Sequence, residues 1–423
     1  MNAAAAAPQP RVLVIVNNFP PDRGGGAAVF GDLCYGLAEQ GYAVTVRCAY
    51  PYYPEWRDKS GRNGWRIWRY EERGVQVERY GLYIPRDPSS VLPRLLHEAS
   101  FLLSLLRSAP RSRAFDAVMV ICPAFSSVIV AACIRILYRK PLWLNVQDLA
   151  VEAAAGSGLL KAGWFARLMR GFQRWLFNRA DLWSSISPVM CERIAPQRTR
   201  QQPLLLIPNW MDEELGQDIR RLHRESPHRS LQRPVRLLYG GNIGMKQNLL
   251  ELLRHLHRSA ADFEFTVHGD GAQAAAVRSW IETCGDRRFR FGPFLDSRGF
   301  AEALFRADYF VITEAPNAGA SFMPSKLVAG IAAGLPILTL SDPDSPLGAE
   351  VRASQLGPWF SWEQLPALAA FVGADATDVG PHAQWVRNGL ARAGEFGRDR
   401  LVARIGAVLA ALIRREPLPE SAG

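Results

Sequence analysis

The chain has 423 residues, which is too long for one ordinary domain and suggests two or three. Its formal charge of +10 favours acidic lipid or phosphorylated substrates over nucleic acid, because neither zinc-finger spacings nor RNP-type aromatic patterns occur. No apolar run reaches the ~20 residues that a membrane-spanning helix needs, and the alanine-rich start has no signal-peptide core. We therefore expect a cytoplasmic protein.

Short apolar runs alternate with amphipathic helical stretches along the whole chain. Strands separated by helices imply parallel sheets with right-handed crossovers. The first predicted series of strands is Val12–Val16, Ala43–Cys48, Val75–Tyr80, Ala117–Ile121, Leu142–Val146 and Leu182–Ile186. The second is Val235–Tyr239, Phe263–His268, Phe289–Phe291, Tyr309–Ile312 and Ile337–Leu340.

The predicted fold class is α/β, with two Rossmann-like, doubly wound parallel-sheet domains that face a central cleft. The first domain covers residues 1–212 and the second covers 235–380. Between them, residues 213–234 are polar and arginine-rich and are predicted to be a linker. The tail, 381–423, is predicted to be helical, with an apolar stripe. Ligands of such folds bind at the carboxyl ends of the strands, so we expect the site in the cleft.

A glycine-rich loop, Gly240–Lys246, joins the strand Val235–Tyr239 to a predicted helix, Asn248–Leu256. Glycine lets the backbone approach a ligand closely, and Lys246 supplies a cation beside the loop. The spacing is neither that of the dinucleotide fingerprint nor that of a P-loop. A plain turn with a solvated lysine is therefore an alternative.

A second loop, Gly319–Ser325, opens into a helix near Lys326 and is followed by the turn Gly334–Pro336. The start of a helix presents unpaired N–H groups and the positive end of its dipole, which suits a phosphate or sugar hydroxyls. Two such corners in one half of the chain favour an anion site, although Lys326 could also be a surface lysine.

Several short motifs follow one another in order over nearly the whole chain. They are Asn17–Pro21 with Gly24–Gly26, Leu144–Asp148, Ile207–Asp212, Gly240–Lys246, His268–Gly271 and Met323–Leu327. Together they resemble the GT-B fold glycosyltransferases of family 4, the retaining type. Within that family the chain is most similar to the colanic-acid-type enzymes of bacterial exopolysaccharide assembly.

The resemblance implies a hexosyltransferase that moves a sugar from a nucleotide donor, keeps the anomeric configuration and uses no metal or other cofactor. It implies that the first domain binds the acceptor and the second binds the donor. It also implies that the C-terminal helix crosses back onto the first domain.

The sequence departs from the family pattern in two places. Many members have a Glu-x7-Glu pair before the Gly-x-Pro turn, where this chain has Ser321 and Ala329, with Glu314 nearby but out of register. Many members also have a histidine where this chain has Gln147. The departures affect the transfer of catalytic roles and leave the predicted fold unchanged.

Glycosyl transfer places negative charge on the leaving diphosphate, and preorganised donors and cations must hold it. Lys246 and Lys326 are the candidate cations. Asp148 is a candidate to orient a hydroxyl or accept its proton, although an aspartate there could also cap a helix. On the acceptor side Gln147 and Glu152 are further candidates. The donor-binding candidates are Gly24, Gly25, Gly241, Asn242, Gly244, Gly269, Ser321 and Ser325.

Membrane contact is suggested by Trp164–Arg179, which places aromatic and aliphatic side chains on one helical face and arginines on the other. A polyprenyl-diphosphate-linked saccharide acceptor at the inner membrane face would explain such a helix. An ordinary surface helix explains it equally well. For the second apolar stretch, Leu92–Leu106, a core helix is the better interpretation.

Two other functions stay open at this point. One is a GT-B-fold sugar-nucleotide epimerase or phosphorylase, whose own motifs, such as a lysine for a pyridoxal cofactor, were not found. The other is a non-catalytic sugar-nucleotide-binding module, because a fold alone never establishes a function.

Overall fold

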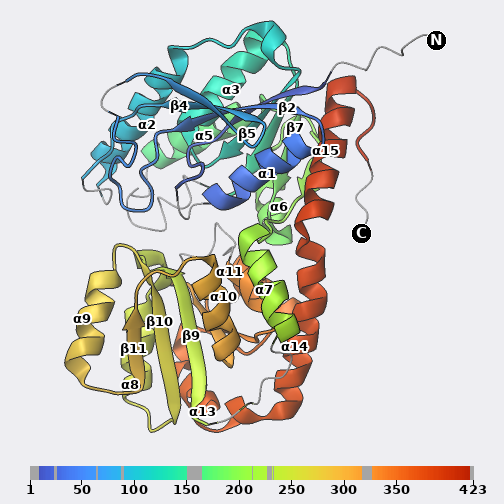
Figure 1. Cartoon of the computed structure of the whole chain (residues 1–423). Helices are drawn as coiled ribbons and strands as arrows, with labels where there is room; N and C mark the ends of the chain where they lie inside the picture. Colours follow the sequence, from blue (N-terminus) through green and yellow to red (C-terminus); the bar gives the residue numbers. More distant parts are fainter. Residues whose placement is uncertain are drawn as a thin grey trace. The chain divides into compact units, whose positions relative to one another are not determined.

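The computed structural model describes residues 9–22, 26–62, 65–86, 90–149, 164–211, 213–225, 231, 233–316 and 326–419. The chain divides into two compact units, each built on its own sheet (Figure 1). Unit 1 is Met1–Pro208 with Asp399–Gly423, and unit 2 is Asn209–Arg398.

Within the described residues, unit 1 contains an eight-stranded sheet in the order β3-β4-β2-β1-β5-β6-β7-β8, in which only β3 is antiparallel to its neighbour. Its strands are β1 (Arg11–Ile15), β2 (Ala43–Ala49), β3 (Trp68–Glu72), β4 (Val75–Tyr80), β5 (Ala117–Cys122), β6 (Leu142–Val146), β7 (Leu182–Ser185) and β8 (Leu204–Leu206). Its helices are α1 (Ala27–Glu39), α2 (Val91–Leu106), α3 (Phe125–Tyr138), α5 (Trp164–Phe177), α6 (Pro188–Ile194) and α15 (Arg398–Arg414).

Unit 2 contains, among its described residues, a six-stranded parallel sheet in the order β11-β10-β9-β12-β13-β14. Its strands are β9 (Val235–Asn242), β10 (Phe263–Asp270), β11 (Phe289–Gly292), β12 (Tyr309–Thr313), β13 (Ile337–Leu340) and β14 (Trp359–Phe360). Its helices are α7 (Glu213–Glu225), α8 (Leu249–His257), α9 (Ala274–Cys284), α10 (Ser297–Arg306), α11 (Lys326–Ala332), α12 (Pro346–Ala353), α13 (Leu365–Gly373) and α14 (Val379–Ala393).

The unit 2 sheet is buried on both faces, because successive side chains of a strand point to opposite sides. Val235, Leu237 and Tyr239 of β9 pack into a core with α8, α9 and α13. Leu238, between them, packs into a second core with α7, α10, α11 and α12. These two apolar layers hold the sheet between helices, which is the α/β architecture that the alternating pattern predicts (Figure 1).

The strand order reverses once in each sheet, and this locates the expected ligand sites. From β9 the chain proceeds through β10 and β11 in one direction and then through β12, β13 and β14 in the other. In unit 1 the corresponding reversal lies between β1 and β5. Doubly wound sheets bind ligands outside the carboxyl ends of the strands at this reversal.

The predicted fold class is confirmed, and the ends of every predicted strand differ from the observed ends by at most three residues. Three strands were missed, namely β3, β8 and β14. They lie at sheet edges, and β8 and β14 are only two or three residues long. The third, β3, is mostly polar and half exposed, so it lacks the continuous apolar run by which buried strands are found.

The predicted linker, 213–234, is wrong in its first half, because residues Glu213–Glu225 form helix α7. Leu215 and Ile219 of this helix are buried in the core of unit 2. Its acidic first turn and basic last turn suit the helix dipole. The charged residues that obscured the apolar period in the sequence are the solvent-facing side of a helix.

The end of the second domain also differs from the expected residue 380. Helix α14 stays in unit 2, where Trp385 packs against the core that contains Tyr309. Only α15 is grouped with unit 1, and there the Tyr42 hydroxyl donates a hydrogen bond to the carbonyl of Gly406 (2.7 Å). Leu401, Ile405 and Val408 of α15 are buried.

Two helices of unit 1 bury some polar side chains and expose several large apolar ones. On α2, His97, Ser100 and Ser104 are buried. The exposed side chains of the same helix include Leu92, Leu95, Leu96, Leu103 and Leu106. Phe101 and Leu105 of α2 are buried, as expected of a core helix, but most of its leucines are exposed. On α5, Gln173 is buried, and the exposed side chains are Trp164, Leu168, Phe172 and Trp175. Exposed apolar patches of this kind usually mark a binding surface.

Truncation of Ile219 tests whether α7 belongs to the core of unit 2. We expect Ile219→Ala to lower the free energy of unfolding of unit 2 by about 2–4 kcal/mol, because it leaves a cavity under the helix. Arg224→Ala, at an exposed position of the same helix, should change it by less than about 0.5 kcal/mol. Differential scanning calorimetry of both variants measures the difference, and equal effects would show that α7 does not stabilise the unit.

Candidate active site

Polar side chains gather in unit 2 where the strand order reverses. Lys246 lies in the loop after β9, Glu314 directly follows β12, and Lys326 is the first residue of α11. The charges of both lysines act on the carboxyl group of Glu314, and the ammonium of Lys326 lies 4.0 Å from the ring centroid of Tyr239 in β9. The two predicted catalytic lysines are therefore brought together, around a carboxylate.

The loop that carries Lys246 is attached to both strands that flank the reversal. The amide of Gly244 donates to Oε1 of Gln247 (2.9 Å), which closes a short 3-10 turn. The amide of Ala315 donates to the carbonyl of Lys246 (2.7 Å), and the hydroxyl of Thr313 donates to that of Gln247 (2.6 Å). Lys246 is thus held at the end of β12 as well as at the end of β9.

Glu314 has a fixed backbone and a buried side chain. Its amide donates to the carbonyl of Leu340 (2.9 Å), and its carbonyl accepts from Nε1 of Trp362 (2.7 Å). The residue is 1% exposed, and no described residue donates a well-aligned hydrogen bond to either carboxylate oxygen. Burial raises the pKa of Glu314 to about 7, opposed by the Ser345 hydroxyl and by the charges of Lys326 and Lys246.

Lys326 is the cationic counterpart of Glu314. Its ammonium nitrogen is buried over the ring of Tyr239, and no hydrogen-bond acceptor for it occurs among the described residues. Burial lowers the pKa of Lys326 to about 7, and the Glu314 carboxylate opposes that shift. Both groups can therefore exist in either protonation state near neutral pH.

A buried acid and a buried amine with so few hydrogen-bond partners suit a ligand that supplies polar groups. Anionic oxygens near Lys326 would favour its charged form, and protonation of Glu314 would then remove a competing negative charge. The choice of lysine fits this chemistry, because a buried lysine can lose its proton whereas arginine cannot. The chain has only five lysines among its 50 basic residues, and two of them are here.

The predicted donor-binding glycines lie beside these lysines at the ends of β9 and β10. Gly269 pairs with Gly241, and Asp270 pairs with Asn242. A Cβ atom on Gly269 would lie 2.1 Å from the carbonyl oxygen of Gly241, so only glycine allows the two strand ends to approach so closely. Gly241 has φ of 106°, in the region that favours glycine, and a Cβ there would meet open space. Gly244 follows in the same loop and packs near the Asn242 side chain.

The predicted acceptor-side residues lie in unit 1. Gln147 and Asp148 follow β6 at its carboxyl end, and Nε2 of Gln147 donates to Oδ1 of Asn145 (2.6 Å). Nδ2 of Asn145 in turn donates to the hydroxyl of Ser184 (3.0 Å). Asp148 is thus grouped with Gln147, whereas Lys246 and Lys326 belong to unit 2. Gly24, Gly25, Glu152, Ser321 and Ser325 lie outside the described residues.

Asp22 is a buried carboxylate of unit 1 that the sequence did not single out. Its Oδ1 accepts hydrogen bonds from the amides of Tyr52 (2.8 Å) and Tyr53 (2.9 Å). Burial raises its pKa to about 6, opposed by these two amides and then by the charge of Arg79. Asp22 therefore fastens the segment before the predicted glycine loop, Gly24–Gly26, to the segment that follows β2.

Two contributors to the unit 2 site were also missed, Glu314 and Tyr239. In the sequence, Glu314 stands out only as a carboxylate that is out of register with the family motif. A better signal is its position, because it is a carboxylate that follows the mostly apolar strand Tyr309–Thr313 at the predicted ligand edge. Tyr239 was counted as a buried strand residue, which it is; its contact with an ammonium could not be inferred from its position.

Glu314 and Lys326 should make the stability of unit 2 pH-dependent. Between the ordinary glutamate pKa of 4.5 and about 7, unfolded Glu314 releases a proton that the folded state keeps, so stability falls as pH rises. Between about 7 and 10.5, unfolded Lys326 keeps a proton that the folded state has released, so stability rises again. The two groups together give a minimum near neutral pH.

We compare the free energy of unfolding of Glu314→Gln with that of the wild type at two pH values. We expect the variant's value, relative to the wild type, to be higher at pH 7 than at pH 5, on the order of 1–3 kcal/mol. The control Glu282→Gln, at an exposed position of α9, should not change with pH in this way. Calorimetric melting of the three proteins at both pH values measures the effect. A difference between Glu314→Gln and the wild type that is the same at both pH values would contradict the assigned burial.

Comparison with known proteins finds similarity to glycosyl transferases. Residues 24–210 match the family model of the glycosyl transferase 4-like domain. The chain is 28% identical over 333 residues to WcaI of Escherichia coli (strain K12), a protein named for glycosyl transfer in colanic acid biosynthesis. That match covers 77% of this chain and 81% of WcaI.

Solved structures show the same fold over almost the whole chain. Sucrose-phosphate synthase from Thermosynechococcus elongatus has a TM-score of 0.70 and 15% sequence identity, and the match covers 96% of this chain and 100% of that one. HepE of Anabaena, in complex with UDP and glucose, has a TM-score of 0.63 and 15% identity, with 95% and 99% covered. The chain therefore has the GT-B fold, and its residues 24–210 are similar to the glycosyl transferase 4-like domain.

Proposed function

We propose that the enzyme takes a sugar from a nucleoside-diphosphate sugar bound by unit 2 and transfers it during assembly of a bacterial cell-surface polysaccharide. The observation that carries this proposal is the group of Lys246, Glu314 and Lys326 beside the glycine-lined ends of β9 and β10. Two relatives support the choice of substrates. HepE binds UDP and glucose, and WcaI is named for the biosynthesis of a polysaccharide.

The proposed chemistry uses the two lysines as the cations for the leaving diphosphate. Charge that develops on the phosphate oxygens is stabilised when fixed donors already surround it. Lys246 offers a cation on a tethered loop, and the amides of the segment Gly241–Gly244 lie beside it. The Lys326 ammonium is held over Tyr239, so it needs little rearrangement to meet an anion. With these groups in place, we propose that transfer needs no divalent metal ion.

Glu314 is proposed to contact the sugar of the donor. A buried carboxyl group with a pKa near 7 can donate a hydrogen bond when protonated and accept one when ionised. It would therefore find partners among sugar hydroxyls that the described protein residues do not provide. This role is distinct from that of the lysines, which act on the phosphates.

On the acceptor side, we retain Asp148 and Gln147 as the proposed contacts, at the end of β6 in unit 1. Asp148 would orient the attacking hydroxyl, and the departing phosphate would accept the proton, so that the acceptor attacks the face of the sugar from which the phosphate leaves.

A lipid-linked saccharide is the proposed acceptor, because α2 and α5 of the same unit expose leucine, phenylalanine and tryptophan side chains. In the described part of the chain no helix has the length and hydrophobicity to cross a bilayer, so we propose peripheral contact with the inner membrane face.

Removal of either lysine should abolish most of the transfer without unfolding the protein. For Lys246→Ala and Lys326→Ala we expect losses of roughly 10²- to 10³-fold in kcat, as for the loss of one donor to a developing anion. Lys140→Ala, in unit 1, is the matched control and should stay within about twofold, as changes away from a site usually do. The donor is first found by thermal shift with UDP-glucose, UDP-galactose, UDP-N-acetylglucosamine and GDP-fucose, since a true ligand raises the melting temperature. Full activity of both variants would refute the assignment of this site.

Metal independence and retention can be measured in one assay. With the donor found above, transfer should continue at the same rate after EDTA is added. Proton NMR of the first product formed should show the anomeric configuration of the donor. An EDTA-sensitive rate that Mg²⁺ or Mn²⁺ restores would refute the metal-free mechanism, and an inverted product would refute retention.

A further inference from the structure

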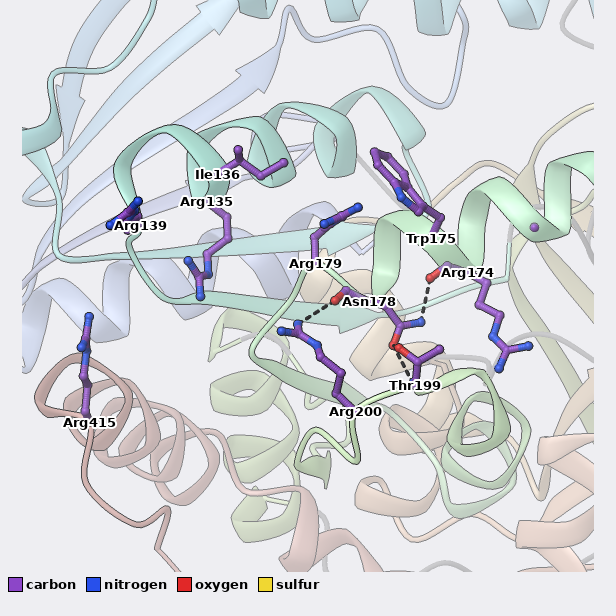
Figure 2. A pocket seen from close by; sticks show the side chains of 11 residues that line it. Arg135, Ile136, Arg139, Arg174, Trp175, Asn178, Arg179, Thr199, Arg200 and Arg415 are labelled. Atoms are coloured by element: carbon purple, nitrogen blue, oxygen red, sulfur yellow. Dashed lines mark hydrogen bonds between the residues drawn. The ribbon is translucent and has the colours of Figure 1, made fainter.

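Unit 1 contains an arginine-lined pocket of about 790 Å³ at the edge of the sheet opposite the proposed acceptor residues (Figure 2). It is lined by the last turns of α3 and α5, the segment before β8 and the residue after α15. The first three of these segments precede β6, β7 and β8, and the strands are parallel. The pocket therefore lies at the amino-terminal ends of the strands, whereas Gln147 and Asp148 lie at a carboxyl end.

The pocket concentrates positive charge. Its arginines are Arg135, Arg139, Arg174, Arg179, Arg200 and Arg415. Arg135 forms a two-bond ion pair with Asp181 (2.6 and 2.9 Å). Within the described residues, no carboxylate pairs with Arg139, Arg179 or Arg415. Like charges held together without counterions repel each other, so the pocket favours an anion.

Two of the arginines are held in place by the protein itself. Nε of Arg174 donates to the carbonyl of Gln197 (3.2 Å), and Nη2 of Arg200 donates to that of Asn178 (2.7 Å). The Asn178 side chain also accepts from the Thr199 amide and hydroxyl (2.7 and 2.8 Å). These bonds build a firm wall, and each guanidinium retains N–H groups for a ligand.

An apolar strip leads to the same pocket. Trp175 lines it and is 51% exposed, with the guanidinium of Arg179 4.4 Å from its ring centroid. Trp164, Leu168 and Phe172 are exposed on the same helix at spacings of three or four residues, so they share one face with Trp175. At the end of α3, Ile136 and Leu137 are exposed as well. Figure 2 shows Ile136 and Trp175 along the same side of the arginine group.

From this arrangement we infer that the pocket binds the phosphate headgroup of an anionic phospholipid, whose acyl chains contact the strip on α5. Guanidinium groups bind phosphate oxygens in a planar, two-bond geometry. A soluble anion would gain nothing from the exposed tryptophan and leucine side chains, whereas a lipid uses both parts. The inference goes beyond the proposed transfer reaction, because it concerns a second site that selects the membrane surface by its charge.

Binding to lipid vesicles tests the inference without any need for transferase activity. The variant Arg139→Gln/Arg179→Gln/Arg415→Gln removes the unpaired charges. The matched control, Arg254→Gln/Arg258→Gln/Arg287→Gln, removes three exposed charges from unit 2. Co-sedimentation is measured with phosphatidylcholine vesicles and with vesicles that also contain phosphatidylglycerol, at physiological salt.

We expect the wild type to prefer the phosphatidylglycerol vesicles. The pocket variant should bind them roughly 10- to 100-fold more weakly, since three arginines near an anionic surface contribute strongly to binding. The control variant should bind these vesicles within about threefold of the wild type, because salt screens charges that lie far from the bound surface. Arg139→Lys/Arg179→Lys/Arg415→Lys keeps the charge and should restore part of the binding, provided that its melting temperature and that of the glutamine variant match the wild type.

Each contrary outcome has a clear meaning. If the pocket and control variants lose vesicle binding to the same extent, the net charge of the protein explains the binding, and the inference is overturned. Equal wild-type binding to both kinds of vesicle would leave peripheral membrane contact standing but remove the role of the pocket. If inorganic pyrophosphate raises the melting temperature only when the pocket arginines are present, and vesicle binding does not depend on them, the pocket takes a soluble anion and the lipid inference is wrong.

Discussion

The burial of Glu314 and Lys326 is the constraint on which the site depends. Among the described residues, only the Ser345 hydroxyl acts on the Glu314 carboxyl group as a hydrogen-bond partner, and no acceptor bonds the Lys326 ammonium. An unpaired charge inside a protein is strongly unfavourable, so both groups shift toward their neutral forms. The fold tolerates this because the backbone of Glu314 is bonded to β13 and to Trp362, and because the sheet around it has an apolar core on each face. These polar groups are thus concentrated at one place, where the strand order reverses beside the glycine-lined ends of β9 and β10.

The plan of the fold was predictable from local patterns. Buried parallel strands such as Ala117–Ile121 and Ile337–Leu340 are continuous apolar runs, and these were found together with their order along the chain. Helices that carry both polar and apolar side chains on their buried or exposed sides were harder to predict. The apolar positions of α7 are few and lie among arginines, and the exposed half of α2 is more apolar than its buried half. In both helices the sequence alone could not decide which side faces the protein, because that depends on what packs against the helix.

The site was predictable in part. Glycines after strands and lysines at strand-to-helix turns have a local physical meaning, and this placed Gly241, Gly269, Lys246 and Lys326 near the ligand edge of unit 2. The role of Glu314 depends on the distance between residues that are far apart in sequence, and on burial by neighbouring elements. Comparison with a family motif directed attention to Ser321 and Ala329, where the acidic pair of many relatives is absent. The carboxylate whose charge acts on Lys326 is that of Glu314, which lies at the end of β12 and outside that motif.

The assignment of α15 to unit 1 has a consequence for synthesis on the ribosome. Unit 2 is continuous, so all of its strands have been translated before the last helix emerges. By then, the described strands of unit 1 have already been made, but helix α15 is still missing from that unit. Tyr42 therefore lacks its hydrogen bond to Gly406, and the apolar surface that α15 covers with buried side chains such as Leu401 stays exposed. Partly folded chains aggregate through exposed apolar surfaces of this kind. The first unit to be made is thus the last to be finished, and chaperones would have their longest opportunity to act on it.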